Sequence, residues 1–135
     1  FSDVDDYGWW GRPGTVNPKH VGVAIIALGF RFGSDDDLNT YLEASREHAA
    51  YCWDAEPDTL IYSAGLAMAD ADREIDLRKG DVVFVMACTD LVAVDKHAND
   101  PRHLALMAEL EAGIQMERTF IRSYKTTGHG FLWRE

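Results

Sequence analysis

One segment, residues 21–32 (VGVAIIALGFRF), constrains the fold more than any other part of this chain. It is apolar and rich in β-branched residues at both alternating sets of positions, which predicts a strand with both faces covered. Residues 81–88 (DVVFVMAC) show the same pattern. A sheet that contains two such strands therefore needs helices on one face and a second covering layer on the other.

The composition indicates a folded core with an acidic surface. Hydrophobic residues make up 47% of the 135 residues, and 13 Lys and Arg stand against 23 Asp and Glu, for a net charge of −10. This length builds one domain, and this charge argues against nucleic acid and anionic membranes as partners. The longest apolar stretch, residues 21–30, is shorter than the roughly 20 residues of a membrane span. We expect a cytoplasmic protein.

The order of the expected elements is typical of a ferredoxin-like α+β fold. The pattern predicts a strand at Val21–Phe32, a helix at Asp36–Ala55, strands at Thr59–Ala67 and Asp81–Cys88, a helix from Asp90 to Ala112 that breaks at residues 99–101, and a strand at Ile114–Tyr124. This β-α-β-β-α-β order gives an antiparallel sheet with two helices on one face.

One segment of the chain and one face of the expected sheet lie outside this β-α-β-β-α-β pattern. Residues 1–19 mix Gly, Pro, acid and aromatics, which predicts an irregular N-terminal arm before a domain at residues 20–135. We expect Trp9 and Trp10 of this arm to pack onto the body or onto a partner subunit. A homodimer that packs sheet against sheet would cover the second face.

Two stretches resemble the antibiotic biosynthesis monooxygenase family. In the first, the helical His48 precedes residues 56–62 (EPDTLIY), similar to a family pattern of His, then Glu-Pro-Gly, a small residue, Leu and Tyr. In the second, residues 84–93 (FVMACTDLVA) with His97 and His103 follow the family's third strand and second helix. The resemblance covers about residues 20–124.

This chain departs from the family pattern at several positions. Met86 and Cys88 stand where a Glu and a Tyr are common, Asp58 replaces the usual Gly, and the loop at residues 68–80 is longer. The resemblance implies a dimeric α+β barrel that oxidises a hydrophobic phenolic or polyketide-like substrate with O2 in secondary metabolism. It also implies that no flavin, metal or haem takes part. Relatives with this fold degrade haem, isomerise or cyclise, so the fold alone does not choose the reaction.

Oxygen chemistry without a cofactor requires a base, because only a deprotonated phenol, enol or anthrone gives electrons readily. His48 lies on the expected sheet-facing stripe of its helix, and His97 lies beside the helix break, so either could remove the proton. Tyr62 could donate its hydroxyl to the enolate oxygen. The alternatives are a core histidine for His48 and a structural hydrogen bond for Tyr62.

Five further residues are candidates for substrate binding. They are Tyr41, Trp53, Met86, His103 and Arg118. Trp53 could wall an aromatic substrate or fill the core, and Arg118 could meet a substrate oxyanion or an interface carboxylate. His103 could also be a solvated residue at a helix end.

The spacing of His and Cys predicts no metal site. His97 and His103 are six residues apart across a helix break, and the chain has neither an H-x-x-x-H motif nor paired cysteines. Cys52 and Cys88 are expected to be buried free thiols.

Three other functions stay open. The same base could serve a cyclase, isomerase or lyase that needs no O2. The chain could be a non-catalytic ligand-binding module, which is favoured if the aromatic arm fills the pocket. Haem degradation is the remaining alternative.

Overall fold

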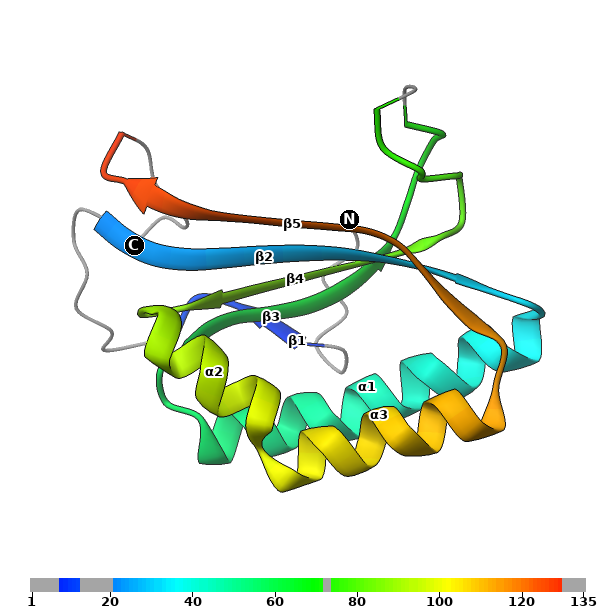
Figure 1. Cartoon of the computed structure of the whole chain (residues 1–135), viewed down its shortest axis with the longest axis horizontal. Helices are drawn as coiled ribbons and strands as arrows, with labels where there is room; N and C mark the ends of the chain where they lie inside the picture. The colour runs from blue at the N-terminus through cyan, green and yellow to red at the C-terminus, as the bar shows by residue number, and fades with distance from the viewer. Residues whose placement is uncertain (1–7, 13–20, 72–73, 130–135) are drawn as a thin grey trace.

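A five-stranded antiparallel sheet carries three helices on one face in the computed structural model (Figure 1). The structure describes residues 8–12, 21–71 and 74–129. The elements are β1 (Gly8–Trp10), β2 (Val21–Phe32), α1 (Asp35–Ala55), β3 (Thr59–Leu66), β4 (Val82–Cys88), α2 (Leu91–Asn99), α3 (Pro101–Gly113) and β5 (Met116–Thr127). From β2 onward this is the predicted order, with the second helix in two pieces, so the ferredoxin-like α+β class is confirmed.

The sheet order β1-β3-β4-β2-β5 aligns one row of side chains beneath the helices. Tyr62 on β3 pairs with Met86 on β4, and Met86 pairs with Ile26 on β2. Residues opposite each other on antiparallel strands share a face. Tyr62 and Met86 belong to the same buried cluster as Cys52 of α1, so this row faces the helices.

β1 differs from the irregular structure expected for the N-terminal arm. Gly8–Trp10 pairs with β3, and Trp9 lies opposite Tyr62. A free strand edge offers unpaired backbone groups, and the Trp9 ring stacks on Tyr62 with 5.5 Å between centroids. Tertiary contacts therefore order a segment without a strand pattern, and the expectation that Trp9 packs onto the body is confirmed. Residues 1–7 and 13–19 of the arm lie outside the described residues.

Each helix begins at a side-chain cap that the sequence contains. Ser34, Asp90 and Asp100 each accept a hydrogen bond from a first-turn backbone N–H, at 3.1, 2.9 and 2.8 Å. Asp100 separates α2 from α3, and Pro101 occupies the first turn of α3. No helix in the described part of the chain has the length and apolar character that crossing a membrane would require.

The sheet face away from the helices is partly covered within one chain. Val23, Ile25, Leu60, Ile61 and Ala87 form a second buried cluster there. Tyr124, which pairs with Ile25 on this face, is 62% exposed. The expected second copy is therefore not needed over the whole face, because part of it is buried without a partner.

Candidate functional site

Helix α1 presents three potential ligands or acid–base groups at intervals of four residues. His48 and Cys52 are buried in α1, and Glu56 is the residue that caps its C-terminus. Four residues are slightly more than one helical turn, so the three side chains follow one stripe of the helix. The backbone N–H of Glu56 donates to the carbonyl of Cys52 at 2.9 Å, and Pro57 then stops the helix. Local sequence therefore fixes where Glu56 lies.

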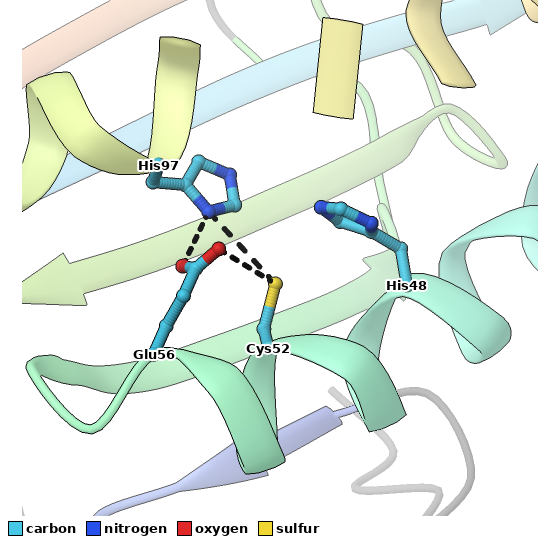
Figure 2. A group of neighbouring side chains, drawn as sticks. All are labelled: His48, Cys52, Glu56 and His97. Atoms are coloured by element: carbon cyan, nitrogen blue, oxygen red, sulfur yellow. Dashed lines mark hydrogen bonds and ion pairs between the residues drawn. The ribbon is translucent and has the colours of Figure 1, made fainter. Parts of the chain in front are cut away.

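His97 of α2 meets this stripe from the opposite side (Figure 2). Its Nδ1 lies 2.7 Å from Oε1 of Glu56 and 3.9 Å from Sγ of Cys52. The Cys52 thiol donates to Oε2 of Glu56 at 3.5 Å. Thr59 at the start of β3 donates its hydroxyl to Oε1 of Glu56 at 2.9 Å. The carboxylate is thus held by groups from α1, α2 and β3.

The surroundings lower the pKa values of two residues of this group, for different physical reasons. Burial acts to raise the pKa of Glu56, but hydrogen bonds from His97, Thr59 and Cys52 outweigh it and hold the pKa below its ordinary value. Burial, with the nearby charges of His97 and His103, lowers the pKa of His48 to about 4. At neutral pH Glu56 is therefore a carboxylate and His48 is a neutral imidazole.

Three imidazole rings and one phenol gather at this point. The His97 ring centroid lies 5.7 Å from that of His48 and 4.7 Å from that of His103. The Tyr62 ring centroid lies 6.1 Å from His48 and 6.2 Å from His97. Burial raises the pKa of Tyr62 well above its ordinary value, so this phenol can donate a hydrogen bond and does not act as a base.

His48 carries the least satisfied polar atom of the cluster. Its side chain is buried, with 5% of the residue exposed, and Nε2 makes no hydrogen bond to any residue that the structure describes. A buried ring nitrogen without a partner is costly and rare in folded proteins. Figure 2 shows the His48 ring directed from α1 toward His97, so this nitrogen belongs to the same site.

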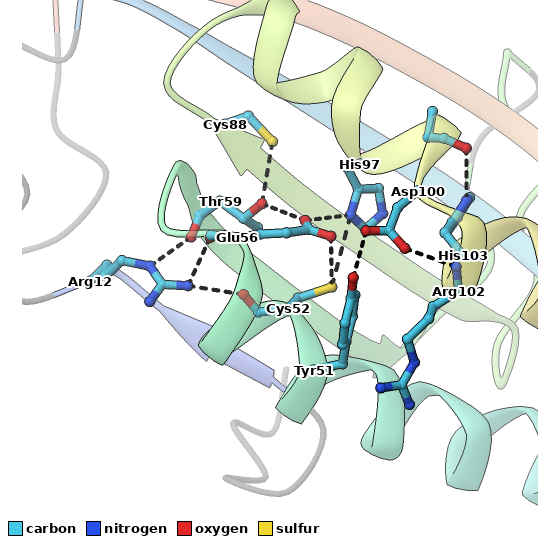
Figure 3. A network of polar contacts seen from close by, with 11 residues as sticks. Arg12, Tyr51, Cys52, Glu56, Thr59, Cys88, His97, Asp100, Arg102 and His103 are labelled. Carbon is cyan, nitrogen blue, oxygen red and sulfur yellow. Dashed lines mark hydrogen bonds and ion pairs between the residues drawn. The ribbon is translucent and has the colours of Figure 1, made fainter.

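A second polar layer lies at the start of α3 (Figure 3). The Tyr51 hydroxyl donates to Oδ2 of Asp100 at 2.6 Å, and the Arg102 guanidinium lies 4.4 Å from the centre of the Tyr51 ring. Asp100 also caps α3, so it connects α1 to the helix that carries His103. This arrangement holds His103 beside the other two histidines.

Arg12 holds the C-terminal end of α1 from the side of β1 (Figure 3). Its guanidinium donates to the backbone carbonyls of Cys52, Trp53, Glu56 and Thr59, at 3.4, 2.9, 3.1 and 3.0 Å. These include carbonyls that a helix end leaves without an internal partner. Arg12 therefore fixes the turn from which Glu56 projects.

The structure brings together five of the eight residues that the sequence singled out. His48, His97, His103 and Tyr62 form the ring cluster, and Met86 lies beside Tyr62 in the sheet. Their roles in catalysis and in substrate binding are proposals.

The other three predicted residues lie outside the ring cluster, although Tyr41 shares the buried core cluster of Tyr62 and Met86. Tyr41 packs between Phe30 and Phe32, with ring centroids at 5.4 and 5.2 Å. Trp53 is 40% exposed and meets Trp9 edge to face at 5.0 Å. Arg118 is exposed on edge strand β5, and sheet order puts β4 and β2 between it and Tyr62. Three strand spacings amount to about 14 Å, so Arg118 is remote from the ring cluster.

Sequence reasoning missed Glu56, Cys52, Tyr51 and Asp100 as parts of the site. One signal was available, since His48, Cys52 and Glu56 repeat at every fourth position. In the structure, one ligand atom from each of His48, Cys52, Glu56 and His97 lies within 4.8 Å of the others. The spacing of His97 and His103 gives no sign of this group, because the residues that converge with His97 come from α1 and its C-terminal cap.

Solved structures match this chain in fold, although no protein-family model and no curated protein is a significant match. A "putative antibiotic biosynthesis monooxygenase" from Deinococcus radiodurans has a TM-score of 0.55 at 15% identity, covering 76% of this chain and 91% of that one. A "dimeric protein of unknown function and ferredoxin-like fold" from Bacteroides fragilis has a TM-score of 0.56 at 17% identity, covering 77% and 95%.

A third match, a "putative monooxygenase" from Lactobacillus acidophilus, has a TM-score of 0.55 at 14% identity and covers 76% of this chain. This chain spans only 42% of the length of that structure. Identities this low show the fold alone. The ferredoxin-like fold found in structures of antibiotic biosynthesis monooxygenases is therefore confirmed for this chain, and its reaction has to be argued from the site.

Proposed function

We propose that this chain is a cofactor-independent monooxygenase that oxidises a hydrophobic phenolic or enolisable substrate with O2. The observation that carries the proposal is the contact at 2.7 Å between the buried His97 and the partly buried Glu56, beside the phenol of Tyr62. A carboxylate that holds a histidine is a common arrangement for a general base. The fold is one in which structures named as putative monooxygenases occur.

The contact with Glu56 favours one position for the hydrogen on the His97 imidazole. A carboxylate accepts hydrogen bonds, so Nδ1 of His97 carries the hydrogen and donates it to Oε1 of Glu56. Nε2 of His97 then carries the lone pair and removes a proton from the substrate. Tyr62 stays protonated and donates to the oxygen of the resulting enolate. The neighbouring His48 is the alternative base.

The reaction needs no external reductant, because the substrate supplies the electrons. With a methylene ketone such as anthrone, the carbon loses two hydrogens and gains one atom of O2 as a carbonyl oxygen. The two hydrogens leave with the second oxygen atom as water, so anthrone plus O2 gives anthraquinone plus water. The protein has to provide only the base, the hydrogen bond to the enolate and exclusion of water.

Oxygen uptake with anthrone tests this function. We expect metal-stripped, flavin-free protein to consume one O2 for each anthrone oxidised, well above the uncatalysed rate. A rate equal to that of buffer would refute the anthrone-type oxygenase. Turnover of an enolisable polyketide under strict anaerobiosis would instead assign the site to a cyclase, isomerase or lyase, since those reactions only move protons or rearrange bonds.

One contact favours a second candidate, a ligand-binding module without catalysis. Trp9 stacks on the Tyr62 ring at an interplanar angle of 18°, and it packs against the same buried cluster. A side chain of the chain itself thus covers part of the phenol that would hold a substrate. This candidate is favoured if no turnover occurs with or without O2 while Trp9→Ala binds anthrone more tightly than the wild type.

We also propose that the chain forms a homodimer through the sheet face away from the helices. Tyr124 is exposed on this face beside the buried Ile25, and a neighbour of the same fold is described as dimeric. Light scattering at micromolar concentration should give twice the chain mass of 15.1 kDa. Tyr124→Asp should shift the protein toward the monomer, because a charge buried in an interface without a partner is unfavourable. A monomeric wild-type protein would overturn the proposal.

A further inference from the structure

Four side chains of different chemistry converge at the end of α1. They are His48, Cys52 and Glu56 of α1 and His97 of α2 (Figure 2). We propose that they bind a divalent transition-metal ion of the zinc class, and that the bound ion switches off the base. The first half stands on these residues alone, and the second half rests on the proposed oxygenase function.

The separations of the ligand atoms are close to those of a tetrahedral metal site. With metal–ligand bonds of about 2.0–2.3 Å, the ligand atoms of such a site lie about 3.3–3.8 Å apart. Here Sγ of Cys52 lies 3.5 Å from Oε2 of Glu56 and 3.9 Å from Nδ1 of His97, and the whole set lies within 4.8 Å. Nδ1 of His97 lies 2.7 Å from Oε1 of Glu56, so the ion would replace this hydrogen bond. Small side-chain rotations would therefore complete the geometry.

The unpartnered nitrogen of His48 is an independent sign of a missing ligand. Nε2 is buried and makes no hydrogen bond to any described residue, although its ring is directed at the cluster. Native proteins rarely leave such an atom unsatisfied. A metal ion would satisfy it and would also replace the long contact between Cys52 and His97 with two coordinate bonds.

The donor set selects the class of metal. Two imidazole nitrogens, one thiolate and one carboxylate suit Zn²⁺ and Co²⁺, whereas Mg²⁺ and Ca²⁺ require oxygen ligands. Cys52 loses its thiol proton on binding, and the thiolate and the Glu56 carboxylate together balance the charge of the ion. His48, Cys52 and His97 are buried and Glu56 is partly buried, so little water competes for the ion.

A metal bound here would block the proposed reaction. Four protein ligands fill a tetrahedron, so no coordination position stays open for O2 or substrate. Coordination through Nδ1 of His97 also moves the imidazole proton to Nε2. The lone pair that would remove the substrate proton is then lost, so the metal-free protein is the active form.

Titration of metal-stripped protein with Co²⁺ tests the binding without any substrate. We expect intense visible bands of tetrahedral Co²⁺, a near-ultraviolet charge-transfer band from thiolate, and displacement of both by one equivalent of Zn²⁺. Cys52→Ser should abolish the thiolate band and weaken Co²⁺ binding at least 10-fold. The matched control, Cys88→Ser, removes the other buried thiol of the chain and should keep the band. A wild-type protein that gives only the spectrum of hydrated Co²⁺ would overturn the proposal, whatever the variants do.

A second measurement separates the two halves of the proposal. Where anthrone is oxidised, one equivalent of Zn²⁺ should reduce O2 uptake at least 10-fold, and a chelator should restore it. Undiminished uptake by protein that holds Zn²⁺ would overturn the inhibition and leave the metal site standing. If anthrone is not oxidised at all, the oxygenase fails, and the Co²⁺ spectrum still decides the binding.

Discussion

Replacing His97 by alanine is expected to lower the kcat of anthrone oxidation by about 10²- to 10⁴-fold, the usual contribution of a general base. The substrate proton must leave before O2 can accept electrons, and His97 is the imidazole that a carboxylate orients at 2.7 Å. Initial rates of O2 uptake by metal-stripped protein measure the effect. Removing metal first is necessary, because an ion bound at the same side chains would mask the base.

Two further substitutions show whether Glu56 acts through His97. Glu56→Gln keeps the size of the side chain but removes the charge that fixes the imidazole tautomer, so kcat should fall at least 10-fold with little change in KM. Glu56→Asp, which keeps the carboxylate, should recover part of that loss. A purely structural role of Glu56 would make the two variants equally inactive.

The surface residue His129 provides a matched control for the His97 variant. It is exposed and its Nδ1 lies 3.0 Å from the hydroxyl of Thr127, so His129→Ala should keep the wild-type rate. If His97→Ala retains full activity, the base is not His97, and His48→Ala becomes the decisive variant. Unchanged uptake in both single variants and in the double variant would remove the base assignment altogether.

Much of the fold was predictable because its signals are local. Apolar residues at both alternating positions predict the strand at residues 21–32, and capping residues predict the helix break at Asp100 and Pro101. The structure has both as expected. β1 was not predictable, because three residues form a strand only where the edge of β3 and the ring of Tyr62 receive them. Pairing of that kind depends on the assembled sheet.

The sequence could predict single residues of the site, but not which of them lie together in the structure. A helical pattern places His48 on a buried stripe, yet it contains no information about which residue of another helix faces it. The pair of Glu56 and His97 spans 41 positions and depends on how α2 packs over the end of α1. Arg118 is the opposite case, a predicted site residue that lies far from the site. Its distance from Tyr62 follows from the strand order, which puts two strands between β5 and β3.

Replacing Arg12 by alanine should lower the free energy of unfolding by about 2–3 kcal/mol. A hydrogen bond from a charged donor contributes about 1.5–3 kcal/mol. The contributions of several bonds from one guanidinium are not additive, and they weaken where solvent reaches them. Its guanidinium donates to four backbone carbonyls at the end of α1. It also lies 5.2 Å from the Trp9 ring and 4.3 Å from the Trp53 ring. Urea denaturation measures this change, from the midpoint urea concentration and from the slope of the unfolding free energy against urea concentration.

Arg122→Ala is the matched control for this loss of stability, because Arg122 is exposed on β5 and donates to the carbonyl of the adjacent Ile121. Its substitution should change the free energy of unfolding by less than about 0.5 kcal/mol. Arg12→Lys should lie between the two, since an ammonium group keeps the charge but cannot reach four carbonyls in one plane. If Arg12→Ala proves as stable as Arg122→Ala, then Arg12 does not hold the end of α1, and the position of Glu56 depends on the helix and on its contacts with Thr59 and His97.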